Sequence, residues 1–485
     1  MSLLPALQEA LDRPPPTLDL SAARTGIRLS QLPVELGLLD RLEVLDLTGN
    51  GLVRLPPLIG RLTGLRVLRL CGNPLLALPP DIGELTLLEE LDLTDVDLSA
   101  LPDGIMRMPR LRRLVLGGNP LVNLSADLKR LAKLPALEEL SLLRLNIRQL
   151  PKEIAGLPAL LSLDLAGNNL AKLCPELTDT SLTSLGIAGN RMTTFPDLVC
   201  GMATLQRLDA SSNAFREIPG DLQELTKLRE LDLRDNKLTL VPTSLGNLRH
   251  LEILRLGGNK LIELPDTIGR LAALRELDLT GNKLASLPEE LGELTEMRVL
   301  DLTDNRGLDW DAAFERIRKM RHLHTLILTN NGVKRIPKAL TDLTALRVLR
   351  LEYNHIGLFP EPILGCAALE ELWMPNNRLL SLPDTIGNLI ALTTLDLSRN
   401  ELTSLPEGVT RLPKLRVLKA PSNRISSLPA GLSRLGALQE LDLGANQVVE
   451  PPVELFALRA DVRLGWWGNP LADEWRGKFM ERWPA

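Results

Sequence analysis

The chain repeats one leucine pattern at a nearly constant interval of 23 residues. In the stretch LRELDLTGNKLASLP, from Leu274 to Pro288, leucines and one asparagine occupy fixed positions, and the same spacing recurs on both sides. We align the copies on one leucine of each, Leu277 in this stretch. The 18 aligned leucines are Leu45, Leu68, Leu91, Leu114, Leu140, Leu163, Leu185, Leu208, Leu231, Leu254, Leu277, Leu300, Leu326, Leu349, Leu372, Leu395, Leu418 and Leu441. Such regularity means that each copy is one structural element packed against its neighbours.

The first half of each copy predicts a short strand. Leucines alternate with a polar residue in Leu277-Asp278-Leu279, so the two leucines point to one face and the aspartate to the other. One strand of this length cannot bury its leucines alone. Stacking the copies about 4.8 Å apart pairs the strands in parallel and closes a continuous apolar core.

The second half of each copy predicts a helical outer wall. A proline such as Pro288 ends strand pairing, and Leu291 and Leu294, three residues apart, suit a short helical or 3-10 turn. A wall of turns is wider than a wall of strands, so the stack curves. The sequence therefore predicts an α/β leucine-rich repeat solenoid of about 18 repeats, with a parallel β-sheet on the concave face and short helices and 3-10 turns on the convex face.

One position of the repeat is asparagine in nearly every copy. The position of Asn282 is asparagine in 16 of the 18 copies, and only Val96 and Leu145 differ. An amide among leucines is costly unless it is hydrogen-bonded, and the sharp turn after each strand leaves backbone groups for it to bind. We expect a buried asparagine ladder with a structural role.

Both ends of the chain depart from the pattern, as terminal repeats of a solenoid do. Residues 1–40 predict an N-terminal cap, with a helix from Leu3 to Leu11 and a degenerate first repeat, residues 41–450 the repeats, and residues 451–485 a degenerate last repeat and a tryptophan-rich cap. We expect an amphipathic helix from about Ala472 whose aromatic side chains cover the core. An exposed docking tail is the alternative. The tryptophans concerned are Trp466, Trp467, Trp475 and Trp483.

Two of the intervals between copies are 26 residues long, before Leu140 and before Leu326. In the second, Phe314, Ile317 and Met320 have helical spacing, and we expect a fuller outer helix capped by Asp311. Each interval is interpreted as an accommodated insertion, with a break in curvature as the alternative.

Composition restricts the function and the location. The net charge of −5 gives no electrostatic case for nucleic acid, and no apolar run is long enough to cross a membrane. The N-terminus lacks the basic and apolar segments of a secretory signal. The four cysteines form no close pair, which favours a reduced, cytoplasmic location. They are Cys71, Cys174, Cys200 and Cys366.

Strand residues whose side chains do not pack in the core show two patterns. The residue after each aligned leucine, expected on the concave face, is most often aspartate. The residue two positions before it alternates in sign over the first five copies, which predicts a solvated ladder of neighbouring ion pairs. This ladder is Glu43, Arg66, Glu89, Arg112 and Glu138.

The concave pattern breaks after the second long interval, where aromatic and cationic residues replace the usual aspartate, glycine or threonine. Tyr353 is the only tyrosine of the chain, and Trp373 stands at a strand position predicted to face the concave side. Tryptophan, tyrosine and arginine dominate binding energy at protein interfaces. We predict a partner-binding surface, named here the Trp373 patch, with a neutral substitution as the alternative. Its residues are Ile327, Arg350, Glu352, Tyr353, Trp373, Asn376 and Lys419.

A weaker candidate follows the first long interval. Val115, Leu143, Arg144 and Leu161 place apolar or cationic side chains where other copies are usually polar. We name these four residues the second patch.

The sequence offers no catalytic constellation. The four histidines, at positions 250, 322, 324 and 355, have no nucleophile or metal partner at useful spacing. No phosphate-binding loop motif is present, and the strand aspartates come one per repeat, too few for a calcium shell. We therefore expect no enzyme activity, no metal and no cofactor.

The repeat LPDTIGNLIALTTLDLSRNELTSLP, Leu382 to Pro406, resembles the 23-residue repeats of intracellular leucine-rich repeat proteins. These are the plant Ras-group-related class, the animal Ras-pathway phosphatase scaffold and the repeat regions of bacterial type III effectors. The resemblance implies a noncatalytic scaffold that binds a protein partner, such as a small GTPase or another signalling protein, on its concave side.

The effectors in this family suggest the alternative function. A bacterial effector would act on host proteins inside a host cell, with the repeats recognising the substrate of a ubiquitin ligase or interfering with signalling. Such effectors usually carry a ligase domain after the repeats, whereas here about twenty residues follow the last recognisable repeat. We therefore expect no ligase activity.

Overall fold

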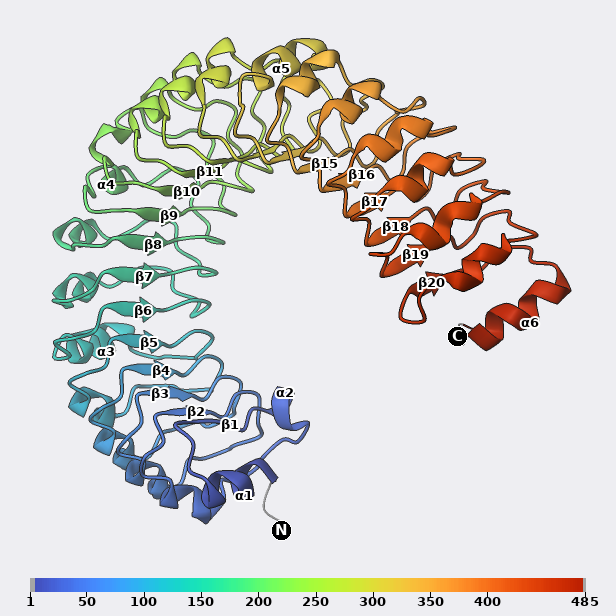
Figure 1. Ribbon diagram of the computed structural model, residues 1–485. Coiled ribbons are helices and arrows are strands. Elements are labelled where there is room, and N and C mark those ends of the chain that lie inside the picture. Colours follow the sequence, from blue (N-terminus) through green and yellow to red (C-terminus); the bar gives the residue numbers. More distant parts are fainter. Residues whose placement is uncertain (1–4, 483–485) are drawn as a thin grey trace. The chain divides into compact units, whose positions relative to one another are not determined.

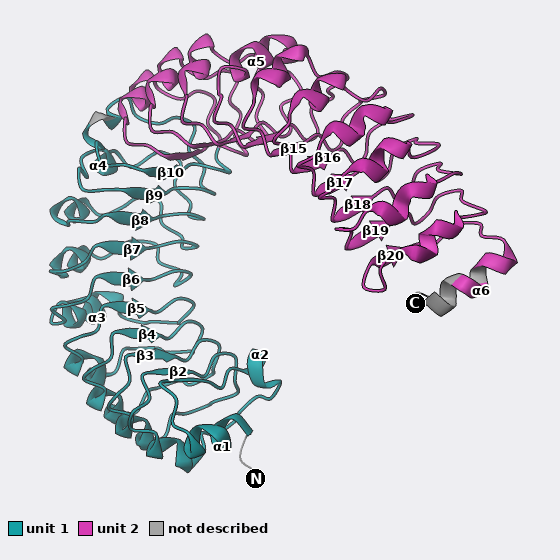
Figure 2. Cartoon of the chain, in the orientation of Figure 1, with its two compact units in different colours: residues 1–236 teal, residues 237–485 magenta. Residues whose placement is uncertain are grey.

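A computed structural model describes residues 5–482 of the chain, which form two compact units, residues 1–236 and 237–485 (Figure 2). In each unit, the strands lie on one side and the short helices on the other (Figure 1). We describe the two units separately.

The described part of the first unit has ten strands. Each has three residues and pairs in parallel with the next along the chain. The strands are β1 (Thr17–Asp19), β2 (Val44–Asp46), β3 (Val67–Arg69), β4 (Glu90–Asp92), β5 (Arg113–Val115), β6 (Glu139–Ser141), β7 (Ser162–Asp164), β8 (Ser184–Gly186), β9 (Arg207–Asp209) and β10 (Glu230–Asp232). The helices and 3-10 helices are α1 (Pro5–Asp12), α2 (Ala22–Thr25), η1 (Val34–Leu38), η2 (Pro57–Arg61), η3 (Pro80–Glu84), η4 (Asp103–Arg107), α3 (Leu124–Leu131), η5 (Lys152–Gly156), η6 (Pro175–Asp179), α4 (Asp197–Cys200) and η7 (Leu222–Glu224).

The described part of the second unit also has ten parallel strands, paired in chain order. They are β11 (Ile253–Arg255), β12 (Glu276–Asp278), β13 (Val299–Asp301), β14 (Thr325–Ile327), β15 (Val348–Arg350), β16 (Glu371–Trp373), β17 (Thr394–Asp396), β18 (Val417–Lys419), β19 (Glu440–Asp442) and β20 (Arg463–Gly465). The helices and 3-10 helices are η8 (Thr243–Asn247), η9 (Asp266–Arg270), η10 (Glu289–Glu293), α5 (Trp310–Ile317), η11 (Lys338–Asp342), η12 (Glu361–Gly365), η13 (Asp384–Asn388), η14 (Glu407–Arg411), η15 (Ala430–Arg434), η16 (Val453–Ala457) and α6 (Asp473–Arg482).

The aligned leucines form the centre of the strands, as predicted. Leu277 pairs in register with Leu300 of the next strand, and all 18 aligned leucines are at most 2% exposed. The turn after Pro288 closes with bonds between residues three apart, from the Leu291 N–H to the Pro288 carbonyl and from the Leu294 N–H to the Leu291 carbonyl. The prediction of a leucine-rich repeat solenoid is confirmed for both units.

The asparagine ladder is buried and hydrogen-bonded, as predicted. The Asn282 side chain is 7% exposed. Its Oδ1 accepts the Leu261 N–H at 3.0 Å, and its Nδ2 donates to the carbonyls of Leu256 and Leu279 at 3.0 and 2.9 Å. Where Val96 replaces asparagine, the Leu75 N–H binds the Val96 carbonyl instead, at 3.1 Å. The adjacent Leu76 then has a positive φ of 56°, a conformation that is costly for a leucine.

The two long intervals are filled by helices while the sheet continues unbroken. They contain α3 and α5, and the strands that flank each helix remain paired in register. The predicted cap of α5 is wrong, because the helix begins two residues earlier than expected. The side chain of Asp309 accepts the Ala312 N–H at 3.2 Å, whereas Asp311 lies inside the helix and pairs with Arg335.

The alternating charges two positions before the aligned leucines form ion pairs in the first unit. Arg66 Nη1 lies 2.6 Å from Glu89 Oε1, and its Nε lies 3.9 Å from Glu43 Oε2. Arg112 pairs with Glu138 at 3.7 Å. The predicted ladder is confirmed at these positions, and it explains the alternating signs without a binding function.

The ends of the described chain carry α1 and α6. Of the predicted terminal helices, Leu3 and Trp483 lie outside the described residues. The Trp475 ring of α6 stacks on Phe456 of η16 with ring centres 5.7 Å apart, whereas Trp467 is 64% exposed. One aromatic side chain therefore covers the last repeat, and a second faces solvent. The cap boundaries at residues 40 and 451 stay predictions.

Candidate protein-binding surface

The aspartates that follow the aligned leucines stabilise the ends of the strands. Each carboxylate accepts the backbone N–H of the residue two positions later, as Asp278 does from Thr280 at 2.9 Å. Such a bond caps a backbone donor that leaves the strand ladder at the turn. The aspartates with this bond are Asp19, Asp46, Asp92, Asp164, Asp209, Asp232, Asp278, Asp301, Asp396 and Asp442. The dominant residue of the concave face is therefore structural, a role that sequence reasoning missed.

The capping aspartate is absent from three consecutive strands of the second unit. β14, β15 and β16 end in Ile327, Arg350 and Trp373, which lie side by side in register. After Trp373 the residue that would donate the N–H is Pro375, which has none. These three repeats lack the hydrogen bond between an aspartate and the backbone that stabilises other strand ends, and they form the centre of the predicted Trp373 patch.

Arg350 is held between Trp373 and Glu352. Its guanidinium carbon lies 5.0 Å from the centre of the Trp373 ring, within range of a cation–π interaction. Its buried Nε lies 3.0 Å from Glu352 Oε1, close enough for an ion pair, although the angle is not that of a hydrogen bond. Thr329 Oγ donates to the other oxygen of Glu352 at 2.8 Å. The arginine is therefore fixed in position while 41% of its side chain stays exposed.

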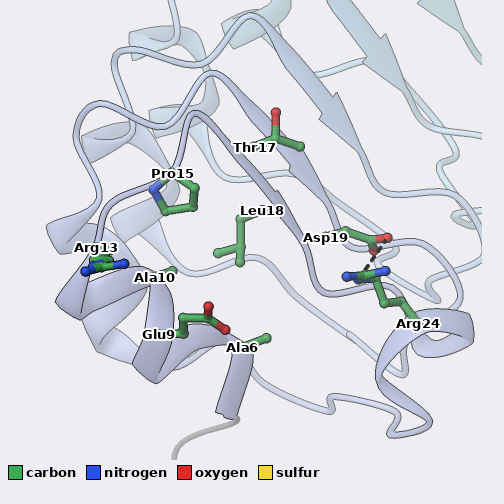
Figure 3. A pocket seen from close by; sticks show the side chains of 9 residues that line it. All are labelled: Ala6, Glu9, Ala10, Arg13, Pro15, Thr17, Leu18, Asp19 and Arg24. Atoms are coloured by element: carbon green, nitrogen blue, oxygen red, sulfur yellow. Dashed lines mark ion pairs between the residues drawn. The ribbon is translucent and has the colours of Figure 1, made fainter.

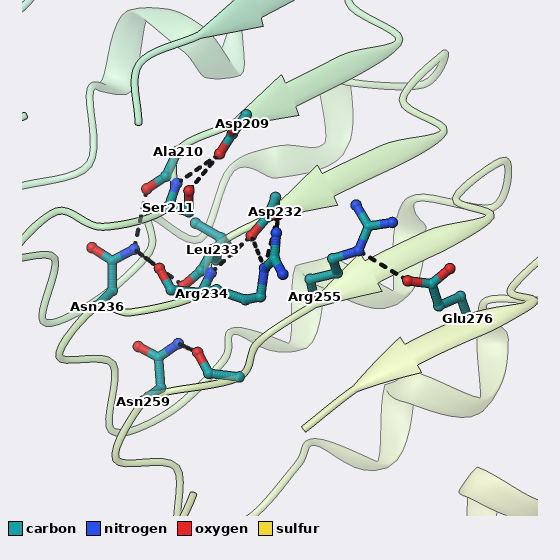
Figure 4. A network of polar contacts seen from close by, with 11 residues as sticks. Asp209, Ala210, Ser211, Asp232, Leu233, Arg234, Asn236, Arg255, Asn259 and Glu276 are labelled. Atoms are coloured by element: carbon teal, nitrogen blue, oxygen red, sulfur yellow. Dashed lines mark hydrogen bonds and ion pairs between the residues drawn. The ribbon is translucent and has the colours of Figure 1, made fainter. Parts of the chain in front are cut away.

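Arginines at the same offset in other strands have a different partner. Arg69 Nε donates to Glu90 Oε1 at 3.1 Å, and Arg255 Nε donates to Glu276 Oε1 at 2.9 Å (Figure 4 shows the second pair). In both cases the carboxylate begins the next strand. The equivalent carboxylate for Arg350 is Glu371, which instead accepts the indole N–H of Trp373 at 2.9 Å. Trp373 is thus hydrogen-bonded to the carboxylate that pairs with the arginine in other repeats, and its own ring contacts the arginine instead.

The remaining residues of the Trp373 patch lie at the strand ends nearby. Ile327 is partly exposed, and Tyr353 and Asn376 occupy the same position in adjacent turns, both with positive φ. Glu352 is almost fully buried and is occupied by its two partners. Lys419 lies beyond Asp396 in register, and its ammonium pairs with Glu440 at 3.0 Å. The hydrogen bond with Glu440 raises the pKa of Lys419. Because its ammonium is paired and 32% of its side chain is exposed, Lys419 is a weaker candidate than Arg350.

The second patch, in the first unit, is a weaker candidate for a binding surface than the Trp373 patch. Val115 is 7% exposed and belongs to the core, and Arg144 is paired with Asp95 at 2.9 Å. Leu161 is 40% exposed and Leu143 is half-buried. No aromatic side chain belongs to this set. Its exposed surface therefore consists of two leucines and of Arg144, which is 54% exposed but already paired with Asp95.

The structure adds residues that the sequence prediction omitted. Arg378 and Arg399 are exposed and lie in the turns that follow β16 and β17. Glu371 positions Trp373 by the hydrogen bond described above. The repeat register was the available signal, because it places the turns after β15, β16 and β17 next to one another.

One pocket of the first unit is lined by charged side chains of α1 and its neighbours. This pocket of about 390 Å³ lies between α1 and β1 and is lined by Glu9, Arg13, Asp19 and Arg24 among others (Figure 3). Its charged groups include an Asp19–Arg24 pair at 4.0 Å, with no cysteine or histidine in the lining. Burial raises the pKa of all four cysteine thiols of the chain, to about 12 for Cys200, which keeps them protonated at neutral pH.

Two further observations on the described residues concern metal ions and membranes. No group of three or more histidine, cysteine, aspartate or glutamate side chains among them is placed to hold a metal ion. No helix in this part of the chain is long and apolar enough to cross a membrane.

Comparisons with known proteins agree with the fold. Family profiles described as "Leucine-rich repeat region" match residues 208–315, and others described as "Leucine rich repeat" match residues 41–62, 63–121, 367–425 and 390–448. No curated protein matches the chain.

Solved structures extend the similarity over most of the chain. A leucine-rich repeat protein of Leptospira interrogans is 30% identical with a TM-score of 0.70, covering 83% of this chain and 96% of that one. The plant peptide hormone receptor RGFR1, in complex with RGF2, is 27% identical with a TM-score of 0.50, covering 94% and 78%. Toll of Drosophila, in complex with Spätzle, shares the fold at 23% identity and a TM-score of 0.56, covering 92% and 60%. With the repeat spacing, the buried ladder and a relative matched along nearly its whole length, the chain belongs to the leucine-rich repeat proteins.

Proposed function

We propose that the chain is a noncatalytic interaction module that binds a protein partner through the Trp373 patch. The observation that carries this proposal is the state of Tyr353, which is 55% exposed in a left-handed conformation with φ of 56°. Seven of the 18 equivalent turn positions are glycine, which adopts this conformation without strain, and ten others hold non-aromatic residues with the same positive φ, so Tyr353 is the one aromatic residue among them. A tyrosine there costs about 1 kcal/mol in backbone energy and adds nothing to the core. Binding a partner accounts for its presence.

The neighbouring residues support the same proposal. Trp373 is partly exposed on the strand face, and Arg350 lies against its ring. Aromatic and arginine side chains that are held in place lose little entropy when a partner binds. Among the similar structures, the plant receptor RGFR1 is described in complex with RGF2, which supports a protein or peptide partner for this fold.

The test is a double variant, Trp373→Ala with Tyr353→Ala, used as bait in affinity purification from the native cell with mass spectrometry. We expect the specific partner of the wild-type protein to be lost. We expect the unfolding transition to change little, because removal of the indole frees Glu371 to pair with Arg350, as Glu90 pairs with Arg69.

A matched control is Ile390→Ala, which removes an apolar side chain that is 61% exposed next to η13, away from the strand ends. This variant should retain the partner. Recovery of the same partner by the double variant and by wild type would show that the Trp373 patch does not bind it.

The finer assignments stay predictions from sequence. They are a scaffold role in signalling, a small GTPase as partner, the cytoplasmic location and the alternative of a bacterial effector. A translocation assay that depends on the secretion system of the source cell distinguishes the effector from a resident scaffold.

A further inference from the structure

The turns near Arg350 carry two arginines, Arg378 and Arg399, whose charge no described neighbour pairs with. Every carboxylate on β15, β16, β17 and the turns that follow them has a partner within the protein; these are Glu352, Glu370, Glu371, Asp396 and Glu401. In contrast, the exposed guanidinium groups of Arg378 and Arg399 make no hydrogen bond or ion pair within residues 5–482. The carboxylates here are thus ion-paired or hydrogen-bonded within the protein, whereas the guanidinium groups of Arg378 and Arg399 are exposed and available to a partner.

Arg350 presents its free edge to the same surface. Its Nε is buried beside Glu352 and its plane lies against Trp373, so the exposed part of the side chain is the end that bears the two Nη atoms. No hydrogen bond within the described residues involves either Nη. A guanidinium held in this way offers two parallel N–H donors, which match the two oxygens of a carboxylate.

The register places the three arginines on neighbouring turns. The Tyr353 N–H donates to the Pro375 carbonyl at 3.0 Å, and the Asn376 N–H donates to the Ser398 carbonyl at 2.9 Å. Consecutive turns after β15, β16 and β17 are therefore in contact. Arg350 ends β15, Arg378 follows in the turn after β16, and Arg399 lies in the turn after β17.

We propose that this surface selects an acidic segment of the partner, with Arg350 binding an aspartate or glutamate carboxylate and with Arg378 and Arg399 attracting the flanking negative charge. The proposal rests on the proposed function and specifies the chemistry of the partner. The Trp373 ring lies against Arg350 and excludes water from one side of the contact, which strengthens an ion pair.

The test uses a random-sequence peptide library displayed on phage and selected on three full-length proteins: wild type, Arg350→Gln and Arg69→Gln. Arg69 is the matched control, because it has the same offset in its strand and the same 41% exposure, but lies within 4.0 Å of two carboxylates, Asp46 and Glu90, where Arg350 has only Glu352 among the described residues. Wild type and Arg69→Gln should enrich peptides with clustered aspartate and glutamate. Arg350→Gln should lose this preference.

The best-enriched peptide is then measured by fluorescence anisotropy against the same proteins. Replacing its central acidic residue by the neutral amide, or using Arg350→Gln, should weaken binding by about tenfold or more, because a charge-assisted contact is lost. A phosphoserine at the same position tests the other anion that guanidinium binds. Tighter binding of phosphoserine than of glutamate would identify a phosphorylated segment as the ligand and overturn the choice of a carboxylate.

The outcomes separate this inference from the proposed function. Enrichment of neutral or basic peptides, no enrichment at all, or the same acidic peptides on Arg350→Gln would overturn the acidic-segment inference. If Arg350→Gln still captures the cellular partner with full affinity while the Trp373→Ala, Tyr353→Ala variant does not, the surface binds a partner by other chemistry. If both variants capture it, the proposed function fails as well.

Discussion

Replacement of Asn282 by alanine tests whether the asparagine ladder holds the repeats together. The Leu261 N–H loses its only partner and remains buried, at a cost of about 1–3 kcal/mol. The carbonyls of Leu256 and Leu279 each keep one donor, from Asn259 and Asn305, both at 2.9 Å. Their lost bonds contribute roughly 0.5–1.5 kcal/mol each. We therefore expect the variant to be destabilised by about 2–6 kcal/mol.

The measurement must resolve single repeats, because stability in a solenoid is a sum of local terms. Native-state hydrogen exchange reports the opening free energy of individual amides, and urea unfolding followed by circular dichroism reports the loss for the unit. Asn388→Ala is the control, since this asparagine is exposed on η13. A change below about 1 kcal/mol in Asn282→Ala, with unaltered exchange of the Leu261 amide, would refute the role of the ladder.

Two further predictions concern aspartates of the second unit. Burial, with a contribution from Asp278, raises the pKa of Asp301, so the ionised carboxylate costs stability at neutral pH and the cost disappears as the pH falls through the folded-state pKa. Asp301→Asn should therefore be more stable than wild type at neutral pH in urea titrations, with a difference that shrinks on acidification; a difference independent of pH would contradict this. Asp309→Ala should lower thermal stability by about 1 kcal/mol through loss of the α5 cap, whereas Asp311→Ala, which breaks an exposed ion pair, should change it by less than about 0.5 kcal/mol.

The backbone architecture follows from the leucine spacing because the core tolerates so few alternatives. A leucine such as Leu277 must face inward from every strand, and a one-residue shift would expose the whole row. The asparagine ladder was equally predictable, since a buried amide at a fixed offset requires hydrogen-bond partners. These features depend on positions that recur in each repeat, so a local argument applies along the whole chain.

The role of the aspartates was not predicted, although its signal was present. Asp278 is followed two residues later by Thr280, and similar Asp-x-Thr sequences occur at Asp46, Asp92 and Asp301. Aspartate favours bonds to the backbone two residues ahead. Because the aspartate side chain points outward from the core, the pattern suggests a surface role and does not by itself reveal the hydrogen bond to the backbone. The same oversight placed the cap of α5 at Asp311 instead of Asp309.

The details of the Trp373 patch depend on competition between side chains, which spacing does not reveal. The register brings three glutamates near cations. In the structure Glu352 pairs with Arg350 and Glu440 pairs with Lys419, whereas Glu371 bonds the indole of Trp373. The choice of Glu371 decides the electrostatics of the surface, because Arg69 lies within 4.0 Å of two carboxylates, Asp46 and Glu90. A tryptophan at the end of β16 therefore acts at a distance of one strand, since its hydrogen bond to Glu371 leaves Arg350 with Glu352 as its one carboxylate partner among the described residues.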